Sequence, residues 1–233
     1  MNLDLNNWLS NGGELRSSGT TGEPKVIFQS PEKLRAANAT AIDSQEITSN
    51  SRIYTVCKTQ HAGGLLAQTL PAYSIGADVV IEDFNAYRFV KEIHKYTHTH
   101  VTPNHARAIM MTKGFTDLDL TGIWVTCGSD PVTWDIIESF VSRGATFMSN
   151  WGMTEIGPCA INTVFRTMDQ VKIYKNTSLA GASLLGDRFY CQHYLSGNEL
   201  LVKGDICIYD DWYNTRDRVS MSKTGELYYH GRL

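Results

Sequence analysis

The sequence predicts an α/β protein, in which a mostly parallel sheet with covering helices is followed by a small antiparallel β subdomain. Two observations carry this prediction. Short apolar runs alternate with stretches of helical spacing over about the first 150 residues. From about residue 177 onward, short strand-like runs are instead separated by Gly, Asn and Asp turns. Alternating strands and helices form parallel sheets that bind ligands at the carboxyl ends of their strands, so we expect functional residues in the strand-to-helix loops.

The two predicted units cover residues 1–176 and 177–233, and residues 170–179 are the predicted join. In the first unit, strand-like runs cover residues 25–29, 53–57, 78–81, 100–102, 123–126 and 145–148. Helical spacing covers residues 31–42, 86–96, 104–112 and 133–142. In the second unit, strand-like runs cover residues 188–194, 199–202, 206–209 and 226–229.

Charge and hydropathy exclude several classes of function. The formal net charge is −3 and the pI is near 6.1, so no broad basic surface is available for a nucleic acid or an anionic membrane. No window approaches the about 20 apolar residues of a membrane span, and the first ten residues do not resemble a signal peptide. Five cysteines are scattered without a C-x-x-C pair, which favours reduced thiols. We therefore expect a soluble, cytoplasmic protein.

The most informative segment lies near the amino terminus and combines glycines, hydroxyls and a lysine. Its glycines let several backbone N–H groups point inward, its hydroxyls add donors, and its lysine adds a positive charge, which together suit a polyphosphate. The spacing differs from the G-x-x-x-x-G-K-[ST] pattern of common P-loop NTPases. A Ser/Gly-rich surface turn is the alternative. The residues are Ser17, Ser18, Gly19, Thr20, Thr21, Gly22 and Lys25.

Five segments in order along the chain form a recognisable set: residues 17–25, 61–65, 128–132, 150–155, and 215–217 together with 231–232. Together they resemble the motifs of the adenylate-forming superfamily, which comprises acyl-CoA synthetases, luciferases and the adenylation domains of peptide synthetases. The resemblance covers nearly the whole chain, and its subfamily features are most similar to o-succinylbenzoate-CoA ligase and fatty acyl-CoA synthetases.

The resemblance implies that a carboxylate attacks the α-phosphorus of ATP and releases pyrophosphate. Residues 17–22 and Lys25 would hold the β- and γ-phosphates. Thr154 would reach the α-phosphate, and Glu155 would bind the Mg²⁺ that bridges the phosphate oxygens. A solvated surface glutamate is the alternative for Glu155. The implied catalytic residues are therefore Lys25, His61, Thr154 and Glu155.

The resemblance also implies an adenine and ribose site. Trp151 would lie flat on the adenine while Asn150 and the turn of residues 128–130 contact its edge, and Asp217 would accept both ribose hydroxyls. A buried core tryptophan and a simple turn aspartate are the alternatives. The full implied set is Gly128, Ser129, Asp130, Asn150, Trp151, Gly152, Met153, Asp217 and Arg232.

The implied acyl pocket consists of His61, Gly63 and Gly64. His61 follows a predicted strand, so its ring is placed to line the tunnel in which the acid meets ATP; a structural histidine is the alternative. Four other histidines, at positions 94, 98, 100 and 105, have no carboxylate or cysteine at ligand spacing, so we predict a partly exposed strand there and no metal site.

The sequence departs from the family pattern at both ends. Only sixteen residues precede Ser17, and the chain stops at Leu233, so the resemblance implies that an amino-terminal subdomain and a carboxy-terminal lid domain are lacking. Within the pattern, Arg16 replaces an aromatic residue and Val26 replaces a glycine. Uncovered apolar surface would then favour a homo-oligomer.

Two hypotheses follow from these residues. The first is an ATP- and Mg²⁺-dependent core that activates a small carboxylic acid, weakly alone or with a lid domain or carrier protein supplied in trans, and with CoA as one candidate acceptor. The second is a non-catalytic relative that binds nucleotide or acyl-adenylate as a sensor or partner protein. The phosphate, metal and ribose residues favour the first. The second is favoured because the resemblance implies that the lacking lid domain carries a lysine used in adenylation.

Overall fold

The computed structural model describes residues 3–16 and 25–233, so the predicted phosphate-binding residues 17–22 lie outside the described residues. A seven-stranded sheet forms the centre, in the order β10-β8-β7-β6-β5-β3-β4. The five strands from β3 to β7 are mutually parallel, whereas β8 and β10 add antiparallel pairings at one edge. The strands are β3 (Arg52–Thr55), β4 (Asp78–Ile81), β5 (His98–Val101), β6 (Trp124–Cys127), β7 (Thr146–Met153), β8 (Gly157–Phe165) and β10 (Arg188–Phe189).

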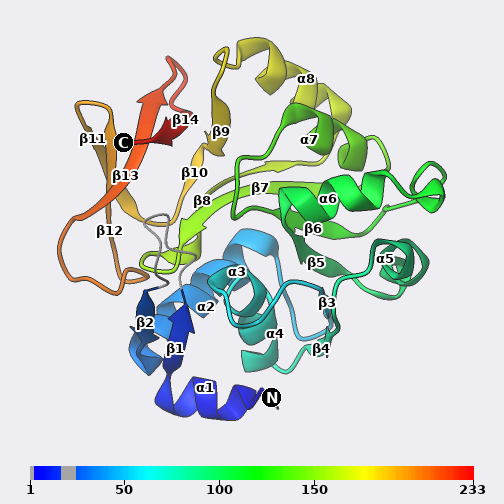
Figure 1. The fold of residues 1–233 in the computed structure, drawn as a ribbon, viewed down its shortest axis with the longest axis horizontal. Coiled ribbons are helices and arrows are strands. Elements are labelled where there is room, and N and C mark those ends of the chain that lie inside the picture. The colour runs from blue at the N-terminus through cyan, green and yellow to red at the C-terminus, as the bar shows by residue number, and fades with distance from the viewer. Residues whose placement is uncertain (1–2, 17–24) are drawn as a thin grey trace.

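Helices cover both faces of this sheet (Figure 1). Successive strand residues point to opposite faces, so Tyr54 packs with the helices α5 to α8, whereas its neighbour Ile53 packs with α4. One face carries α2 (Pro31–Gln45), α3 (Ala62–Leu65) and α4 (Thr69–Ser74). The other carries α5 (Ala86–Glu92), α6 (Pro103–Met110), α7 (Trp134–Val141) and α8 (Met168–Thr177), with short 3₁₀ turns at Ile93–Lys95 and Lys113–Phe115.

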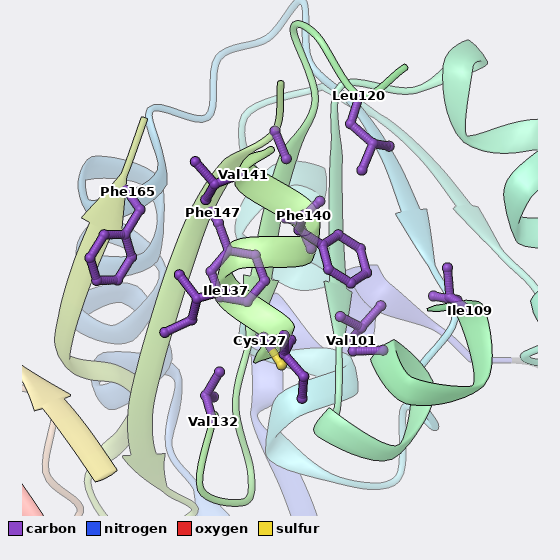
Figure 2. Packing of buried hydrophobic residues seen from close by; sticks show 14 of the residues in the cluster. Val101, Ile109, Leu120, Cys127, Val132, Ile137, Phe140, Val141, Phe147 and Phe165 are labelled. Carbon is purple, nitrogen blue, oxygen red and sulfur yellow. The ribbon is translucent and has the colours of Figure 1, made fainter. Parts of the chain in front are cut away.

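The largest apolar cluster lies between the sheet and α6 and α7, as Figure 2 shows. Phe140 of α7 packs against Phe147 of β7, with ring centroids 5.7 Å apart, and both side chains are fully buried. Ile137 and Val101 fill the same layer from α7 and β5. This packing fixes the positions of the strand ends that carry the site.

A second, five-stranded sheet is antiparallel throughout, in the order β11-β12-β13-β14-β9. It lies beside the large sheet (Figure 1) and has its own apolar cluster, which includes Leu200, Val219 and Leu227. Its strands are β9 (Ser183–Gly186), β11 (Gln192–Ser196), β12 (Glu199–Lys203), β13 (Tyr213–Met221) and β14 (Leu227–Arg232).

The amino-terminal segment forms helix α1 (Leu5–Asn11) and a two-stranded hairpin of β1 (Gly13–Arg16) and β2 (Val26–Gln29). Leu15 of this hairpin packs on α3 and α4 through Leu65, Leu66 and Leu70. The strand predicted at residues 25–29 therefore forms, but it pairs antiparallel with β1 outside the large sheet.

The fold confirms the α/β class with a parallel sheet and an additional antiparallel sheet. Three local predictions were wrong. Residues 206–209 form a turn and bends, the run 188–194 divides into β10 and β11 in different sheets, and β5 with His98 and His100 is buried instead of partly exposed. The predicted unit boundary falls at the end of α8. Among the described residues, no helix is long and apolar enough to cross a membrane.

Candidate active site

A cavity of about 800 Å³ lies at the carboxyl ends of the parallel strands β3, β5, β6 and β7. Its wall on that side comes from the residues that follow these strands, in agreement with the expectation for parallel sheets. The small sheet supplies the opposite wall through residues 213–216 of β13 and through Arg232 of β14. The amino-terminal hairpin adds Arg16 and Lys25. The cavity is therefore built by three segments that are distant in sequence.

Most residues that the sequence singled out meet at this cavity. Gly128, Trp151 and Asp217 are not among the residues that line it, and residues 17–22 lie outside the described part of the chain. The predicted residues that line it are Lys25, His61, Gly63, Gly64, Ser129, Asp130, Asn150, Gly152, Met153, Thr154, Glu155 and Arg232.

Glu155 lies directly after β7, in the turn that leads to β8, and its side chain faces the cavity although it is only 6% exposed. The turn is held on both sides: Gln29 donates to the carbonyl of Thr154 at 2.8 Å, and the N–H of Ile208 donates to the carbonyl of Glu155 at 2.9 Å. Burial and the Glu155 carboxylate raise the pKa of Tyr213 to about 12. Glu155 therefore brings a fixed carboxylate to a largely enclosed position.

The carboxylate of Glu155 fits a magnesium ion that is held mainly by phosphate. No cluster of three or more potential metal ligands exists among the described residues, so they provide no cage made of protein alone. Mg²⁺ typically takes one or two carboxylates plus substrate phosphates and waters. A single buried carboxylate beside the cations Lys25 and Arg232 meets that requirement.

Asn150 of β7 presents an unpaired acceptor at the cavity. Its Nδ2 donates to the carbonyl of Pro158 at 2.5 Å, which fixes the amide. Its Oδ1 is buried and has no hydrogen-bond partner among the described residues. Because buried polar atoms are normally paired, this oxygen is available to a donor such as an exocyclic amine.

Asp217 of β13 is engaged by other side chains. The indole of Trp151 donates to its Oδ2 at 2.9 Å, and Arg232 Nε lies 3.0 Å from Oδ1 as an ion pair without hydrogen-bond alignment. Asp217 is 2% exposed. Burial raises the pKa of this carboxyl, while Arg232 and Trp151 partly offset the effect. A ribose could reach Asp217 only if one of these contacts moved.

The cavity carries an excess of positive charge. Among its described lining residues, the cations Arg16, Lys25, Lys58, Arg216 and Arg232 outnumber the carboxylates Asp130 and Glu155. The whole chain has a net charge of −3, so this excess is local. Clefts lined by one sign of charge attract ligands of the opposite sign, here an anion such as a polyphosphate or a carboxylate.

Two non-glycine residues at the cavity have positive φ angles, a left-handed backbone conformation that residues with a side chain rarely adopt. Ser129 has φ 77° and Arg216 has φ 60°, and only Glu46 shares this feature among the described non-glycine residues. Such conformations cost about 1–3 kcal/mol and concentrate at functional sites. They place the Ser129 hydroxyl and the Arg216 side chain at the cavity wall.

Sequence reasoning missed several residues of the cavity wall. Lys58, Thr102 and Tyr213 line it, and so do His100 and His105, which had been considered only as metal ligands and rejected. A signal existed for two of them, because Lys58 follows one predicted strand and Thr102 ends another, at the edge where ligands bind. Tyr213 could not be found in this way, since its strand β13 was not predicted.

Comparison with known proteins identifies a matching family and similar relatives. A family described as AMP-binding enzyme matches residues 17–232. The indoleacetate–CoA ligase of Aromatoleum aromaticum is 27% identical over 93% of this chain and 46% of its own length. The chain thus spans about half the length of this relative.

Two solved structures share the fold. The o-succinylbenzoate coenzyme A synthetase of Bacillus subtilis in complex with AMP has a TM-score of 0.75 at 19% identity, over 94% of this chain and 49% of that one. ATP-bound MatB from Rhodopseudomonas palustris has a TM-score of 0.74 at 17% identity, over 94% of this chain and 47% of that one. At these identities the likeness concerns the fold.

Proposed function

The chain belongs to the AMP-binding enzyme family, and we propose that it binds ATP in the cavity and uses it to activate a carboxylic acid as an acyl-adenylate. The observation that carries this proposal is the meeting of Lys25, Glu155 and Arg232 at one cavity. They come from the hairpin, the large sheet and the small sheet, and they combine two cations with one carboxylate. That combination suits a metal-bound polyphosphate.

Adenylation requires two anions, the acid and the α-phosphate, to be brought together. Lys25 and Arg232 would reduce their repulsion, and the hydroxyl of Thr154 would orient the α-phosphate. Glu155 would hold Mg²⁺, and the ion would supply positive charge that offsets the charge of the phosphates. Because Glu155 is largely buried and its turn is fixed by Gln29 and Ile208, it would need little rearrangement on binding.

The nucleotide base would occupy the part of the cavity beside β7. The unpaired Oδ1 of Asn150 would accept a hydrogen bond from the adenine amine, with Gly152 and Met153 beside it. Asp217 would bind the ribose after the Arg232 contact loosens, since Arg232 is the half-exposed partner and the Trp151 bond is the better aligned.

The acid would enter from the His61 side and pass the backbone of Gly63 and Gly64. His61 caps α3, and its Nδ1 lies 3.3 Å from the carbonyl of Arg16, so it links the acid side to the hairpin. CoA is a candidate acceptor, because the relative from Aromatoleum aromaticum is a CoA ligase.

A second candidate is a protein that binds nucleotide or acyl-adenylate without turnover. The observation behind it is that Asp217 already contacts protein side chains, since Oδ2 accepts from Trp151 and Oδ1 lies 3.0 Å from Arg232, although Oδ1 has no hydrogen-bond partner among the described residues. The two functions differ in acid-dependent pyrophosphate exchange, which only the enzyme performs.

The test combines two measurements on one preparation. Calorimetry with Mg-ATP measures binding, and ATP–pyrophosphate exchange with a panel of acids, including indole-3-acetate, measures adenylation. We expect binding together with exchange that depends on the acid. Binding without exchange for any acid would favour the second candidate, and no binding would refute both.

A further inference from the structure

The end of the cavity beside β3 and β5 contains a buried polar atom without a partner. His100, the second-last residue of β5, lines the cavity and is 4% exposed. Its Nδ1 is buried and makes no hydrogen bond to another residue of the described chain. Native proteins rarely leave such an atom unpaired. A buried, unpaired ring nitrogen at a cavity therefore points to a partner on the ligand.

The open space in front of this ring exists because residue 63 is a glycine. A Cβ on Gly63 would lie 2.9 Å from Cε1 of His100, 3.6 Å from its Nδ1 and 3.0 Å from Oγ of Ser129. Any side chain at position 63 would fill the space that the imidazole and the hydroxyl both border. The two groups thus converge on one small volume, and Ser129 is held there by its left-handed backbone.

The strand order places His100 away from the predicted nucleotide region, and Ser129, which follows β6, lies between the two. Asn150 belongs to β7 and Glu155 to the turn after it, and β6 lies between β7 and β5. Neighbouring strands are about 4.8 Å apart, so β5 is about 10 Å from β7. A group bound at His100 would therefore be remote from the α-phosphate, at the far end of an acid whose carboxylate lies near Thr154.

The chemistry of this volume favours an uncharged partner. Burial, followed by the nearby His105, lowers the pKa of His100 to about 4, so the ring is neutral near pH 7 and has one N–H and one acceptor nitrogen. The Ser129 hydroxyl can also donate and accept. A hydroxyl or ring N–H on the ligand matches both groups, whereas a purely apolar end would leave Nδ1 unpaired.

We propose that His100, together with Ser129, determines the acid specificity of this cavity by binding an uncharged hydrogen-bonding group, a hydroxyl or a ring N–H, at the end of the acid remote from its carboxylate. The inference rests on the proposed function in one respect, namely that the ligand of the cavity is a carboxylic acid. His100 is a specificity-determining residue in this role and takes no part in the transfer of the adenylyl group.

The test compares pairs of acids that differ only in this group. Suitable pairs are 4-hydroxyphenylacetate with 4-methylphenylacetate, and indole-3-acetate with indene-3-acetate. Calorimetry measures the dissociation constant of each acid in the presence of magnesium and α,β-methylene-ATP, which cannot be cleaved to pyrophosphate. We expect the hydrogen-bonding member of at least one pair to bind about 10- to 100-fold more tightly, the usual effect of leaving a buried polar group unpaired.

Variants test whether this preference between the paired acids depends on His100. His100→Phe should reduce the ratio within the pair to about 1, mainly by weakening the hydrogen-bonding acid, whereas His100→Gln should restore part of it. His98→Gln is the control, because His98 lies on the same strand outside the cavity and its ring contacts Thr97 and the carbonyl of Gln45. If His100→Phe does not fold, Gly63→Ala provides a second test, since the added methyl would occupy the space in front of Nδ1 and the Ser129 hydroxyl and should weaken the hydrogen-bonding acid more than its partner.

The outcomes separate this inference from the proposed function. Equal affinity within every pair, or equal losses for both members in His100→Phe, would overturn the role of His100 even if exchange is observed. Discrimination that depends on His100 without any pyrophosphate exchange would support the site and overturn adenylation. If no acid binds in the presence of the nucleotide analogue, the inference and the proposed function both fail.

Discussion

The indole Nε1 of Trp151 donates a hydrogen bond of 2.9 Å to Oδ2 of Asp217, and this bond joins β7 of the large sheet to β13 of the small sheet. Both residues are predicted to contact the nucleotide, and in this structure they contact each other and are not among the residues that line the cavity. The carboxylate also holds Arg232, which does line the cavity. The Trp151 bond therefore helps to fix the carboxylate that forms an ion pair with Arg232.

Trp151→Phe should reduce the free energy of unfolding by about 1–3 kcal/mol, because it leaves the buried Oδ2 of Asp217 without its donor. Urea denaturation at pH 7.5 measures this change. Trp134→Phe is the matched control, since Trp134 is also half-buried but its indole N–H bonds no other described residue. Equal losses in the two variants would show that lost packing, and not the hydrogen bond, is responsible.

The class of fold could be predicted from the sequence because apolar runs and helical spacing alternate clearly. The predicted runs at residues 78–81 and 199–202 fall on β4 and β12. The hairpin strand at residues 26–29 was placed in the wrong sheet, because periodicity identifies a strand but not its partner. Strand β13 escaped prediction because its five consecutive polar residues, 214–218, show no alternation of apolar and polar side chains, although Thr215, Asp217 and Val219 are buried.

The candidate site was predicted less completely than the fold. Motif residues such as Glu155 and Asn150 were found because they follow or end a recognisable strand. His100 was missed as a cavity residue, since a histidine inside a strand gives no sign of whether an adjoining loop leaves space before it. That space depends on Gly63, which is 37 residues away in sequence. Such convergence comes from tertiary packing and has no local pattern.

Glu155→Gln should weaken binding of Mg-ATP by about tenfold or more while changing the binding of AMP in EDTA much less, because the amide lacks the negative charge that the metal requires. Calorimetry with and without magnesium measures both affinities. Asp130→Asn, at the other carboxylate of the cavity, is the control and should show a smaller magnesium-dependent loss. Equal losses for Mg-ATP and metal-free AMP in Glu155→Gln would argue against a metal role.

His100 should make the protein less stable as the pH falls. Burial lowers its pKa to about 4 in the folded state, whereas an exposed histidine in the unfolded chain has a pKa near 6.5. The unfolded chain therefore gains a proton between pH 6.5 and 4 that the folded protein does not, and stability is lost over this window. From pH 7.5 to 5.5 the loss due to His100 is about 1 kcal/mol.

His100→Gln should reduce the pH-dependent loss by that amount, which urea denaturation at the two pH values can measure. Burial also lowers the pKa of His98 and His105, so part of the acid sensitivity should remain. A variant with the same pH dependence as the wild type would mean that His100 is not buried as a neutral ring.

Gly64→Ala should destabilise the protein and disturb the acid side of the cavity. A Cβ at this position would lie 2.1 Å from the carbonyl oxygen of Lys58, a backbone atom that cannot rotate away. Overpacking of this kind typically costs about 1–3 kcal/mol. Gly76→Ala is the control, because it has open space and a φ of 78°, so it tests backbone strain alone. A larger loss at Gly76 than at Gly64 in thermal denaturation would contradict this account.

The most direct test of the central claim is ATP–pyrophosphate exchange, measured with and without a carboxylic acid, for the wild type and Glu155→Gln. Exchange is expected only when an acid is present, and almost none is expected in Glu155→Gln because the variant lacks the carboxylate that would hold the metal. Exchange that does not require the acid, or no exchange for any acid despite tight binding of Mg-ATP, would contradict the claim that this cavity activates carboxylic acids.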